Sequence, residues 1–308
     1  MIEVHELQPG DVDVVVERIA RQLARDAAHR PLINPDFSRD LLADALHSAR
    51  ASTWTAHREG RLVGHLFGAR LANATHGTGI WIGPDGVSYD DDEVLDALYA
   101  HAATHWIDAG AGEHFVWTLD DATATLPWYQ LGFARVHVRG VLALGEHRHD
   151  LPPGYALRRG TAKDLDLALA LDDELDAAQY AGPSFARQLS TSSQRGEWAE
   201  TLADPETCHY VVDFEGTGVA QCVTYPLAPQ RSSFAHTVHL SGVVVARDHR
   251  RRGVALAMVD AALEEARSRG FEFAETSWRE TNREASRYWR RYGFEPTYVR
   301  LHRTIGPY

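Results

Sequence analysis

The chain of 308 residues contains very little cysteine and lysine. Cys208 and Cys222 are too few for a disulfide framework, so we interpret them as small buried hydrophobic residues on two neighbouring strands. Lys163 is the only lysine, a bias that points to a GC-rich genome rather than to a function. No run of about 18 apolar residues occurs, which excludes a conventional membrane-spanning helix.

The sequence also lacks a basic N-terminal segment followed by an apolar one, so we expect no secretory signal and a cytoplasmic location. The formal net charge of −12 argues against general binding to nucleic acid. Most of the acidic excess lies in the first 150 residues. Such a surface attracts cationic amines, although acidic surfaces more commonly serve solubility. A hydrophobic content of 44% supports two domains of ordinary size.

The most specific feature is a basic turn between an apolar run and a predicted helix. Residues 250–255 read Arg-Arg-Arg-Gly-Val-Ala, after the valines at 243–245 and at the start of a helix predicted over 254–267. The first N–H groups of a helix have no intrahelical acceptor, so they can bind a phosphate. Gly253 permits close approach of the backbone, and the arginines add positive charge. The predicted anion-binding residues are Arg250, Arg251, Arg252, Gly253, Val254 and Ala255.

Two motifs in this half resemble a known family. The pattern Arg-x-x-Gly-x-Ala after a Val-rich strand resembles motif A of the GNAT superfamily, the acyl-CoA-dependent N-acetyltransferases. About 30 residues downstream, Asn282-x-x-Ala285-x-x-x-Trp289 followed by Gly293-Phe294 is similar to the Asn-x-x-Ala…Tyr…Gly-Phe segment of the family. The resemblance implies that the basic turn holds the pyrophosphate of acetyl-CoA. It also implies that Asn282, Ala285 and Trp289 belong to a helix beside the pantetheine arm.

The resemblance also implies where the reaction takes place. In the family, the cofactor enters between two parallel central strands that splay apart, and the strand before the loop offers it backbone groups. Here those positions are Val243, Val244 and Val245, and the N–H near Val244 or Val245 is the implied donor to the oxyanion. The acyl group passes directly to a primary amine of a small molecule or peptide, without a covalent enzyme intermediate.

The general base has two candidates. His239 and Ser241 alternate on the strand before the loop, so their side chains face one side. The stretch resembles that of family members in which two histidines relay a proton through water; His239 matches one of them, and Ser241 stands in place of the other. An unperturbed histidine titrates near pH 6.5, which suits this task. The alternative is a histidine held in place by a hydrogen bond, and Glu275 on the following strand is a second candidate base.

The general acid departs from the family pattern. Trp289 occupies the usual tyrosine position and cannot donate a proton at a useful pKa. Tyr288 is adjacent but about 100° around the helix, and Tyr292 is one turn further on. Three alternatives follow: one of these tyrosines substitutes, the thiolate leaves without a protein acid, or catalysis has been lost. In the last case the chain is an acetyl-CoA-binding sensor or scaffold.

The two halves of the chain share one plan. Each predicts a strand, two helices, a hairpin, and then alternating strands and helices. Residues 124–133 repeat the pattern Ala-x-x-x-Trp-x-x-x-Gly-Phe of residues 285–294, a shift of 161 positions. We interpret this as a tandem duplication, with domains at 1–148 and 149–308 joined by a polar linker at 146–154. The predicted fold is α/β (α+β mixed): two tandem GNAT-like domains, each with a mixed, largely antiparallel sheet flanked by helices.

The first half lacks the basic turn. Residues 83–93 end in four consecutive acidic side chains where the turn should be. Carboxylates suit the start of a helix, but at about 4 Å and an effective dielectric near 20 each repels a phosphate charge by about 4 kcal/mol. We therefore expect the first domain not to bind coenzyme A, and to be a structural or substrate-side companion.

The remaining signals are weak. His101 and His105 have helical spacing but lack the glutamate that a zinc protease needs, so we expect no metal site. Trp81, Trp117 and Trp278 stand near predicted strand ends, where they are candidates for lining a substrate pocket. For the oligomeric state, the sequence leaves a monomer or a homodimer open.

Overall fold

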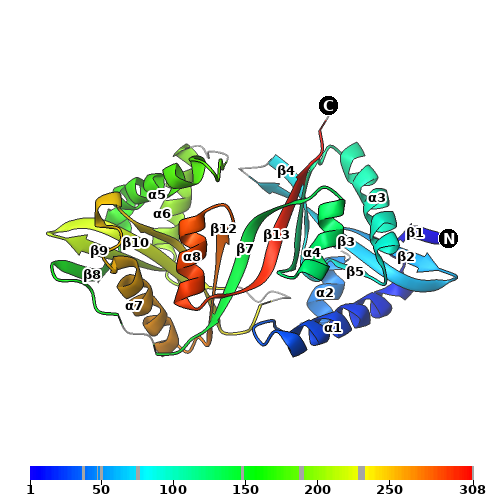
Figure 1. The fold of residues 1–308 in the computed structure, drawn as a ribbon, viewed down its shortest axis with the longest axis horizontal. Coiled ribbons are helices and arrows are strands. Elements are labelled where there is room, and N and C mark those ends of the chain that lie inside the picture. The colour runs from blue at the N-terminus through cyan, green and yellow to red at the C-terminus, as the bar shows by residue number, and fades with distance from the viewer. Residues whose placement is uncertain are drawn as a thin grey trace. The chain divides into compact units, whose positions relative to one another are not determined.

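The computed structural model describes residues 1–36, 39–46, 48, 51–73, 77–146, 149–186, 191–227 and 233–306. The chain divides into two compact units (Figure 1). Unit 1 comprises Met1–Arg139, Pro229–Phe234 and Pro296–Tyr308, and unit 2 comprises Gly140–Ala228 and Ala235–Glu295. His147 and Arg148, in the predicted linker, lie outside the described residues.

Unit 1 follows the predicted order of strands and helices. Its first elements are β1 (Ile2–Glu6), α1 (Val12–His29), α2 (Arg39–Leu46), β2 (Ala51–Arg58), β3 (Arg61–Asn73) and β4 (Gly77–Ile82). The others of this half are β5 (Val87–Tyr89), α3 (Asp92–Asp108), β6 (Glu113–Leu119), α4 (Ala122–Gln130) and β7 (Ala134–Ala143). Helix α1 buries Val15, Val16, Ile19 and Leu23, the spacing of one helical face. The short strand β5 is an element that the sequence pattern did not predict.

The second half repeats this order. Its elements are β8 (Tyr155–Arg159), α5 (Leu165–Tyr180), α6 (Thr191–Ala203), β9 (Cys208–Phe214), β10 (Thr217–Pro226), β11 (Thr237–Val245), α7 (Val254–Ser268), β12 (Phe273–Arg279), α8 (Arg283–Tyr292) and β13 (Glu295–Thr304). Both cysteines are buried and unpaired, as predicted. Thr161 and Asp164 form a reciprocal capping box around the short 3-10 helix Ala162–Asp164, which leads into α5.

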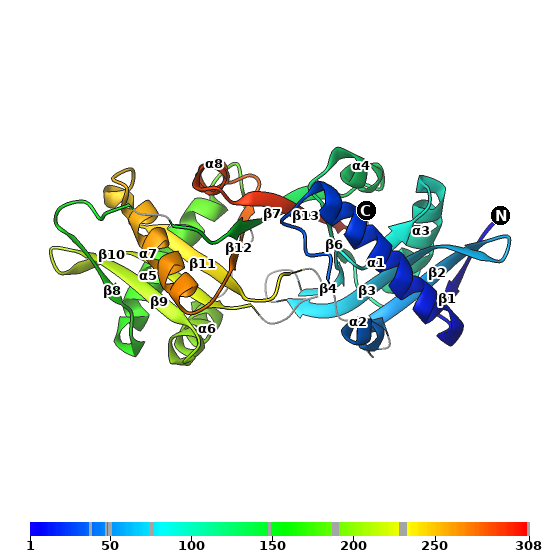
Figure 2. The ribbon, with the colours of Figure 1, turned by 90° about the horizontal axis from the view of Figure 1, so that it is seen from below.

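The sheet of each unit is mixed and largely antiparallel, which confirms the predicted fold class. In unit 1 the strand order is β1-β2-β3-β4-β6-β13-β7, with β5 paired to β3, and in unit 2 it is β7-β12-β11-β10-β9-β8. The pairs β4–β6 and β11–β12 are parallel. Figure 2 shows α2 and α4 on opposite sides of the unit 1 strands, and α6 and α8 on opposite sides of the unit 2 strands.

The last strand of each half completes the other unit. Strand β13 follows α8 of unit 2, yet it pairs antiparallel with β6 from Tyr298↔Leu119 to Thr304↔Glu113. Strand β7 leaves unit 1 after Arg139, and just beyond it the Leu144 N–H donates to the Glu272 carbonyl at 2.8 Å in unit 2. The sequence did not foresee this exchange, because periodicity reports the faces of a strand and not its partner. The boundary at 148/149 stays a prediction about the domains.

The repeated tryptophan motif packs alike in both units. Trp128 meets Phe133 edge-on with ring centroids 5.1 Å apart and planes at 79°, and Trp289 meets Phe294 at 5.2 Å and 81°. Both tryptophans are buried. Such edge-to-face pairs are a favourable aromatic geometry, so the equal geometry supports a common origin of the halves. Among the described residues, no helix is long and apolar enough to cross a membrane.

Candidate functional site

The start of α7 is an uncapped helix terminus. Gly253 adopts a left-handed backbone, with φ of 85°, and no side chain caps the helix. The N–H groups of Gly253, Val254 and Ala255 have no acceptor within the described ranges, and the first helical bond is donated by Ala257. A Cβ on Gly253 would meet nothing within 4 Å, so the space beside these amides is open. Converging amides, an open approach and the positive end of the helix dipole together suit an anion.

The three arginines of the basic turn have different surroundings. Arg250 donates from Nε to the Val245 carbonyl at 2.8 Å and lies 3.4 Å from Glu174. Its guanidinium is therefore engaged in holding the turn against β11. Arg251 is exposed, with Glu284 at 4.0 Å, and Arg252 is exposed without a partner in the described part of the chain. Arg251 and Arg252 are the better placed of the three to reach a ligand phosphate.

Strands β11 and β12 separate beside this turn. Their parallel pairing covers Thr237↔Phe273, Val238↔Ala274 and His239↔Glu275, and the buried Thr276 hydroxyl donates to the Leu240 carbonyl at 2.8 Å. Beyond that point the two strands, both fully described, have no further paired positions, although β11 continues to Val245 and β12 to Arg279. The splayed parallel pair that the family resemblance implies is therefore present in unit 2.

One peptide edge of β11 faces this separation. The Ala246 N–H donates to the Val219 carbonyl of β10, so by strand alternation the N–H and carbonyl of Val245 point away from β10. The Val245 carbonyl accepts from Arg250, whereas the N–H of Val244 points toward β10. The family resemblance implied that the N–H of Val244 or of Val245 donates to the oxyanion. Of these two, only the Val245 N–H points toward the separation between β11 and β12. Val243 follows a bulge in the β10–β11 pairing at Gly242, where φ is 60°.

Three side chains form a row across unit 2 at the last paired positions. His239 is opposite Tyr225 on β10 and opposite Glu275 on β12. The rings of Tyr225 and His239 lie 5.0 Å apart, and Glu275 is buried. Burial raises the pKa of Tyr225, and the Glu275 carboxylate adds to the rise. The structure therefore brings two predicted base candidates together, with a tyrosine that the sequence analysis missed.

This row lies on the face of the sheet that α5 and α6 cover. Gln221 donates to the Ala168 carbonyl of α5 at 3.0 Å, and Val223 packs with Trp198 of α6. Tyr225 is two residues beyond Val223 on β10, so its side chain lies on the same face. His239 and Glu275 are its cross-strand neighbours, and their side chains therefore lie on that face too. Ser241, half-buried and opposite Val223, is on the same side.

The two candidate acids lie on the α8 side. The Tyr288 hydroxyl donates to the Ala255 carbonyl at 3.1 Å, in the first turn of α7. The Tyr292 hydroxyl donates to buried Asp260 at 2.6 Å, further along α7, and His149 contacts the other oxygen of that carboxylate at 2.6 Å. Burial is the main cause that raises the pKa of both tyrosines well above its usual range. Tyr288 is therefore the candidate beside the uncapped turn, whereas Tyr292 is committed to Asp260.

The downstream motif has a clear local role. Asn282 caps α8 by accepting the Ala285 N–H at 3.1 Å, which explains the spacing of Asn and Ala. Gly293 ends the helix in a left-handed conformation, with φ of 115°. Trp289, at the tyrosine position of the family, is buried against Phe294. Roles for Asn282, Ala285 and Trp289 in holding a cofactor stay predictions.

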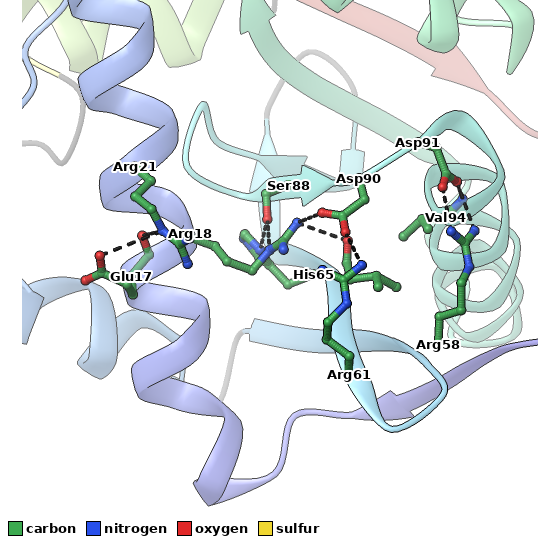
Figure 3. A network of polar contacts seen from close by, with 11 residues as sticks. Glu17, Arg18, Arg21, Arg58, Arg61, His65, Ser88, Asp90, Asp91 and Val94 are labelled. Carbon is green, nitrogen blue, oxygen red and sulfur yellow. Dashed lines mark hydrogen bonds and ion pairs between the residues drawn. The ribbon is translucent and has the colours of Figure 1, made fainter.

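The equivalent helix start in unit 1 is already satisfied. Asp91 caps α3 by accepting the Val94 N–H at 3.1 Å, and Arg58 donates to both of its oxygens at 2.7 and 3.2 Å (Figure 3). The Arg58 guanidinium lowers the pKa of Asp91. Asp90 accepts from Arg18 at 2.8 Å and from Arg61 at 3.0 Å. These carboxylates fill the terminus from within the protein.

The parallel strands of unit 1 also stay together. Strands β4 and β6 pair from Gly79↔Glu113 to Ile82↔Val116, which includes the last residue of β4. Trp81 stacks on Phe115 across the pair, at 4.3 Å between ring centroids and 19° between planes. Trp81 thus packs on a neighbouring strand, and Trp278 is buried under α8, where Arg290 lies over its ring.

Sequence reasoning missed two carboxylates of α5. One holds the basic turn, and the other holds α6 through Trp198. Glu174 of α5 accepts the Arg247 N–H at 3.0 Å and pairs with Arg250. Asp172 accepts the Trp198 indole N–H at 3.0 Å, and burial raises its pKa. The acidic run at 172–176 was the available signal, because helical spacing places part of such a run toward the sheet.

Comparison with known proteins finds a family match for the part of the chain that carries this geometry. Residues 173–294 match the model of the acetyltransferase (GNAT) family. This segment holds β11, the basic turn, α7, β12 and α8. This part of the chain is therefore similar to the acetyltransferases of the GNAT family. No curated protein sequence matches the chain.

Solved structures extend the likeness to the whole chain. A GCN5-related N-acetyltransferase from Sphaerobacter thermophilus is similar at a TM-score of 0.68 and 18% identity, over 99% of this chain and 96% of that one. A tandem GNAT protein from the clavulanic acid biosynthesis pathway is similar at 0.58 and 18%, over 100% of both chains. At these identities the likeness concerns the fold. Over its whole length the chain therefore has the fold of these two structures, which agrees with the two similar halves that the repeated motifs predicted.

Proposed function

We propose that unit 2 binds acetyl-CoA and transfers its acetyl group to a primary amine. One observation carries the proposal: the uncapped, open start of α7 lies directly after the strand that separates from β12. An anion-binding terminus and an adjacent opening between parallel strands are the two features that a diphosphate with a long thioester arm requires. The family match of residues 173–294 supports this choice of ligand.

The residues present fit the coenzyme. The N–H groups of Gly253, Val254 and Ala255 would bind the diphosphate, with Arg251 and Arg252 adding charge. The open backbone edge of β11, from Val243 to Val245, would bind the pantetheine arm. When bound, acetyl-CoA supplies an acyl group activated as a thioester.

His239 is the group that we assign to proton removal. It faces the side of the sheet that α5 and α6 cover, next to Tyr225 and Glu275. An imidazole there accepts a proton from the ammonium through water, and neighbouring Glu275 favours the resulting imidazolium. The Val245 N–H points to the open side, where it would donate to the thioester carbonyl oxygen of bound acetyl-CoA.

Tyr288 is the proton donor that the geometry favours. Its hydroxyl lies at the first turn of α7, on the opposite side of the sheet from His239. Because burial raises its pKa, the hydroxyl keeps its proton at neutral pH and can donate a hydrogen bond. Acid and base would then approach the opening between β11 and β12 from opposite faces of the sheet, a geometry compatible with direct transfer without a covalent enzyme intermediate.

A second function is favoured by one observation. Trp289 fills the tyrosine position and packs on Phe294 in the way that Trp128 packs on Phe133 in unit 1. If packing is the whole role of this position and Tyr288 is not an acid, unit 2 binds acetyl-CoA without turnover. The chain would then be a sensor or a scaffold.

A screen of amines with acetyl-CoA and a thiol indicator separates the two functions. It should include small-molecule amines, polyamines and peptides with free N-termini. Release of free coenzyme A that depends on an added amine supports the transferase. Binding of acetyl-CoA without turnover for any amine favours the sensor, and absence of binding contradicts both.

A further inference from the structure

Unit 1 contains a cavity of about 440 Å³ between α1, the end of β6 and the start of α4. This volume is within the range of small-molecule sites. Its apolar wall includes Trp117 and Leu119 of β6 and Tyr89 at the end of β5, so one predicted pocket tryptophan does line a cavity. The opposite wall is the charged last turns of α1. The cavity therefore combines an aromatic side with a charged side.

One carboxylate in the charged wall lacks a partner. Asp26 is half-buried, and its side chain forms no hydrogen bond or ion pair with any described residue. Burial raises its pKa, Asp121 adds to the rise, and Arg25, Arg30 and His29 oppose it. A partly desolvated carboxylate without a hydrogen-bond donor is costly to keep in a fold. A cationic group in the cavity would remove that cost.

The other charged groups nearby divide into occupied and available ones. Arg30 donates to the Asp120 carbonyl at 2.7 Å and lies 3.5 Å from Asp121. Asp121 also caps α4 by accepting the Thr123 N–H at 2.8 Å. Arg25 is exposed at the rim and forms no hydrogen bond or ion pair with a described residue. One carboxylate and one guanidinium, on consecutive residues of α1, remain available to a ligand, and the exposed His29 imidazole lies in the same wall.

We propose that the unit 1 cavity binds a small zwitterion with an apolar body, of the size of an amino acid or a dipeptide. Its ammonium group pairs with Asp26 and its carboxylate with the Arg25 guanidinium, which prefers planar oxyanions. Its apolar body lies against Trp117 and Leu119, where aromatic and aliphatic surface is buried.

In its described part, unit 1 lacks the two features that make unit 2 suitable for coenzyme A. The start of α3 is capped by Asp91, and β4 and β6 remain paired to the end of β4. Neither free amides for a diphosphate nor an opening for a pantetheine arm is present among these described residues. The proposed ligand is therefore distinct from the acyl donor, and the proposal stands independently of the function assigned to unit 2.

Calorimetric titration of the full chain with three related probes tests the site. Phenylalanine carries both charges, phenethylamine lacks the carboxylate, and 3-phenylpropionate lacks the ammonium. We expect phenylalanine, or an aromatic dipeptide, to bind at least about tenfold more tightly than either single-charge analogue, since each loses one charge-assisted contact. Equal affinity for all three probes would contradict the paired-charge arrangement.

Variants assign the two charges to residues. Asp26→Asn should weaken phenylalanine about tenfold and leave 3-phenylpropionate unchanged, whereas Arg25→Gln should weaken phenylalanine and leave phenethylamine unchanged. Glu17→Gln, a carboxylate on α1 that pairs with Arg39 away from the cavity, is the matched control and should change nothing.

The outcomes separate this proposal from the function of unit 2. Absence of heat with every amino acid and dipeptide, or heat that Asp26→Asn does not alter, overturns the zwitterion site. Acetyl-CoA should bind the Asp26→Asn protein as it binds the unaltered chain. A loss of acetyl-CoA affinity alone would concern the proposed function of unit 2 and not the cavity.

Discussion

The two units place a helix start at the same point of the same fold and satisfy it in opposite ways. In unit 1, Asp91 caps α3, and Arg58 neutralises the cap. In unit 2, Gly253 turns left-handed and leaves its own amide and those of the next two residues open. The fold supplies the same helix dipole in both cases. The sequence decides whether the protein or a ligand provides the negative charge.

A second difference lies in the parallel strands beside each helix. Strands β4 and β6 pair to the end of β4 and carry the stacked Trp81 and Phe115, whereas β11 and β12 part after Leu240. A capped helix alone would remove the anion site, and a closed strand pair alone would remove the path for a thioester arm. Unit 1 has both the capped helix and the closed strand pair. Removing only one of them should therefore not create a coenzyme A site in unit 1.

Gly253→Asp gives the helix start of unit 2 an acidic side chain like that of unit 1. Of the changes considered, it should have the largest effect, a loss of affinity for acetyl-CoA. The change gives α7 a carboxylate near its amides, and each like-charge contact with a diphosphate costs about 4 kcal/mol at short range. Affinity for acetyl-CoA should fall about a thousandfold in calorimetric titration. Gly216→Asp, at a hairpin glycine with φ of 81° and open space, carries the same strain and should bind normally. Retained affinity in Gly253→Asp would refute the site.

The buried network of unit 1 should respond to acid. Burial lowers the pKa of His65 to about 4, and Arg18 adds to the shift. As pH falls from 6.5 to 4, the unfolded chain binds a proton that the folded chain excludes, so stability is lost over this range. The loss for this group is on the order of 3 kcal/mol. Urea unfolding at pH 7 and pH 4.5 should show a clearly smaller difference for His65→Asn, and an unchanged difference would exclude His65 as the cause.

His239→Ala tests whether unit 2 adds chemistry to binding. Loss of a general base should lower kcat about a hundredfold and leave the affinity for acetyl-CoA unchanged. The loss should be largest at low pH, where the amine is hardest to deprotonate. Ser241→Ala is the comparison on the same strand face, and a smaller effect is expected there. A uniform loss at every pH would remove His239 from the proton path.

Asp91→Ala probes the contrast from the unit 1 side and should have the smallest effect. Loss of the cap should cost about 1 kcal/mol of stability, measured by urea unfolding. In a Gly253→Asp background, removal of the cap should not create coenzyme A binding, because β4 and β6 stay paired. Asp96→Ala, on an exposed position of α3, is the matched control. Binding gained by Asp91→Ala would mean that the strand pair is not a barrier.

The sequence predicted the order of elements and the position of the basic turn because these depend on local patterns. Valine runs, helical spacing and glycine before α7 are all contained within a few residues. The spacing of Asn282 and Ala285 was visible for the same reason, since a cap and its N–H lie three residues apart.

What the sequence could not supply depends on distant parts of the chain. The pairing of β13 with β6 joins residues more than 170 positions apart, as in Tyr298↔Leu119. The engagement of Arg250 with Glu174 and the row of Tyr225, His239 and Glu275 likewise require the folded sheet. In the sequence the three arginines of the basic turn look equivalent. Only the folded structure shows that Arg250 is bonded within the protein, whereas Arg251 and Arg252 are exposed.

The most direct measurement is a calorimetric titration of the full chain with acetyl-CoA and with desulfo-coenzyme A. We expect both to bind at one site per chain, because each carries the diphosphate that the amides of Gly253, Val254 and Ala255 would hold. Absence of heat and of thermal stabilisation with both compounds would contradict the account, and two equivalent sites would contradict the difference between the units.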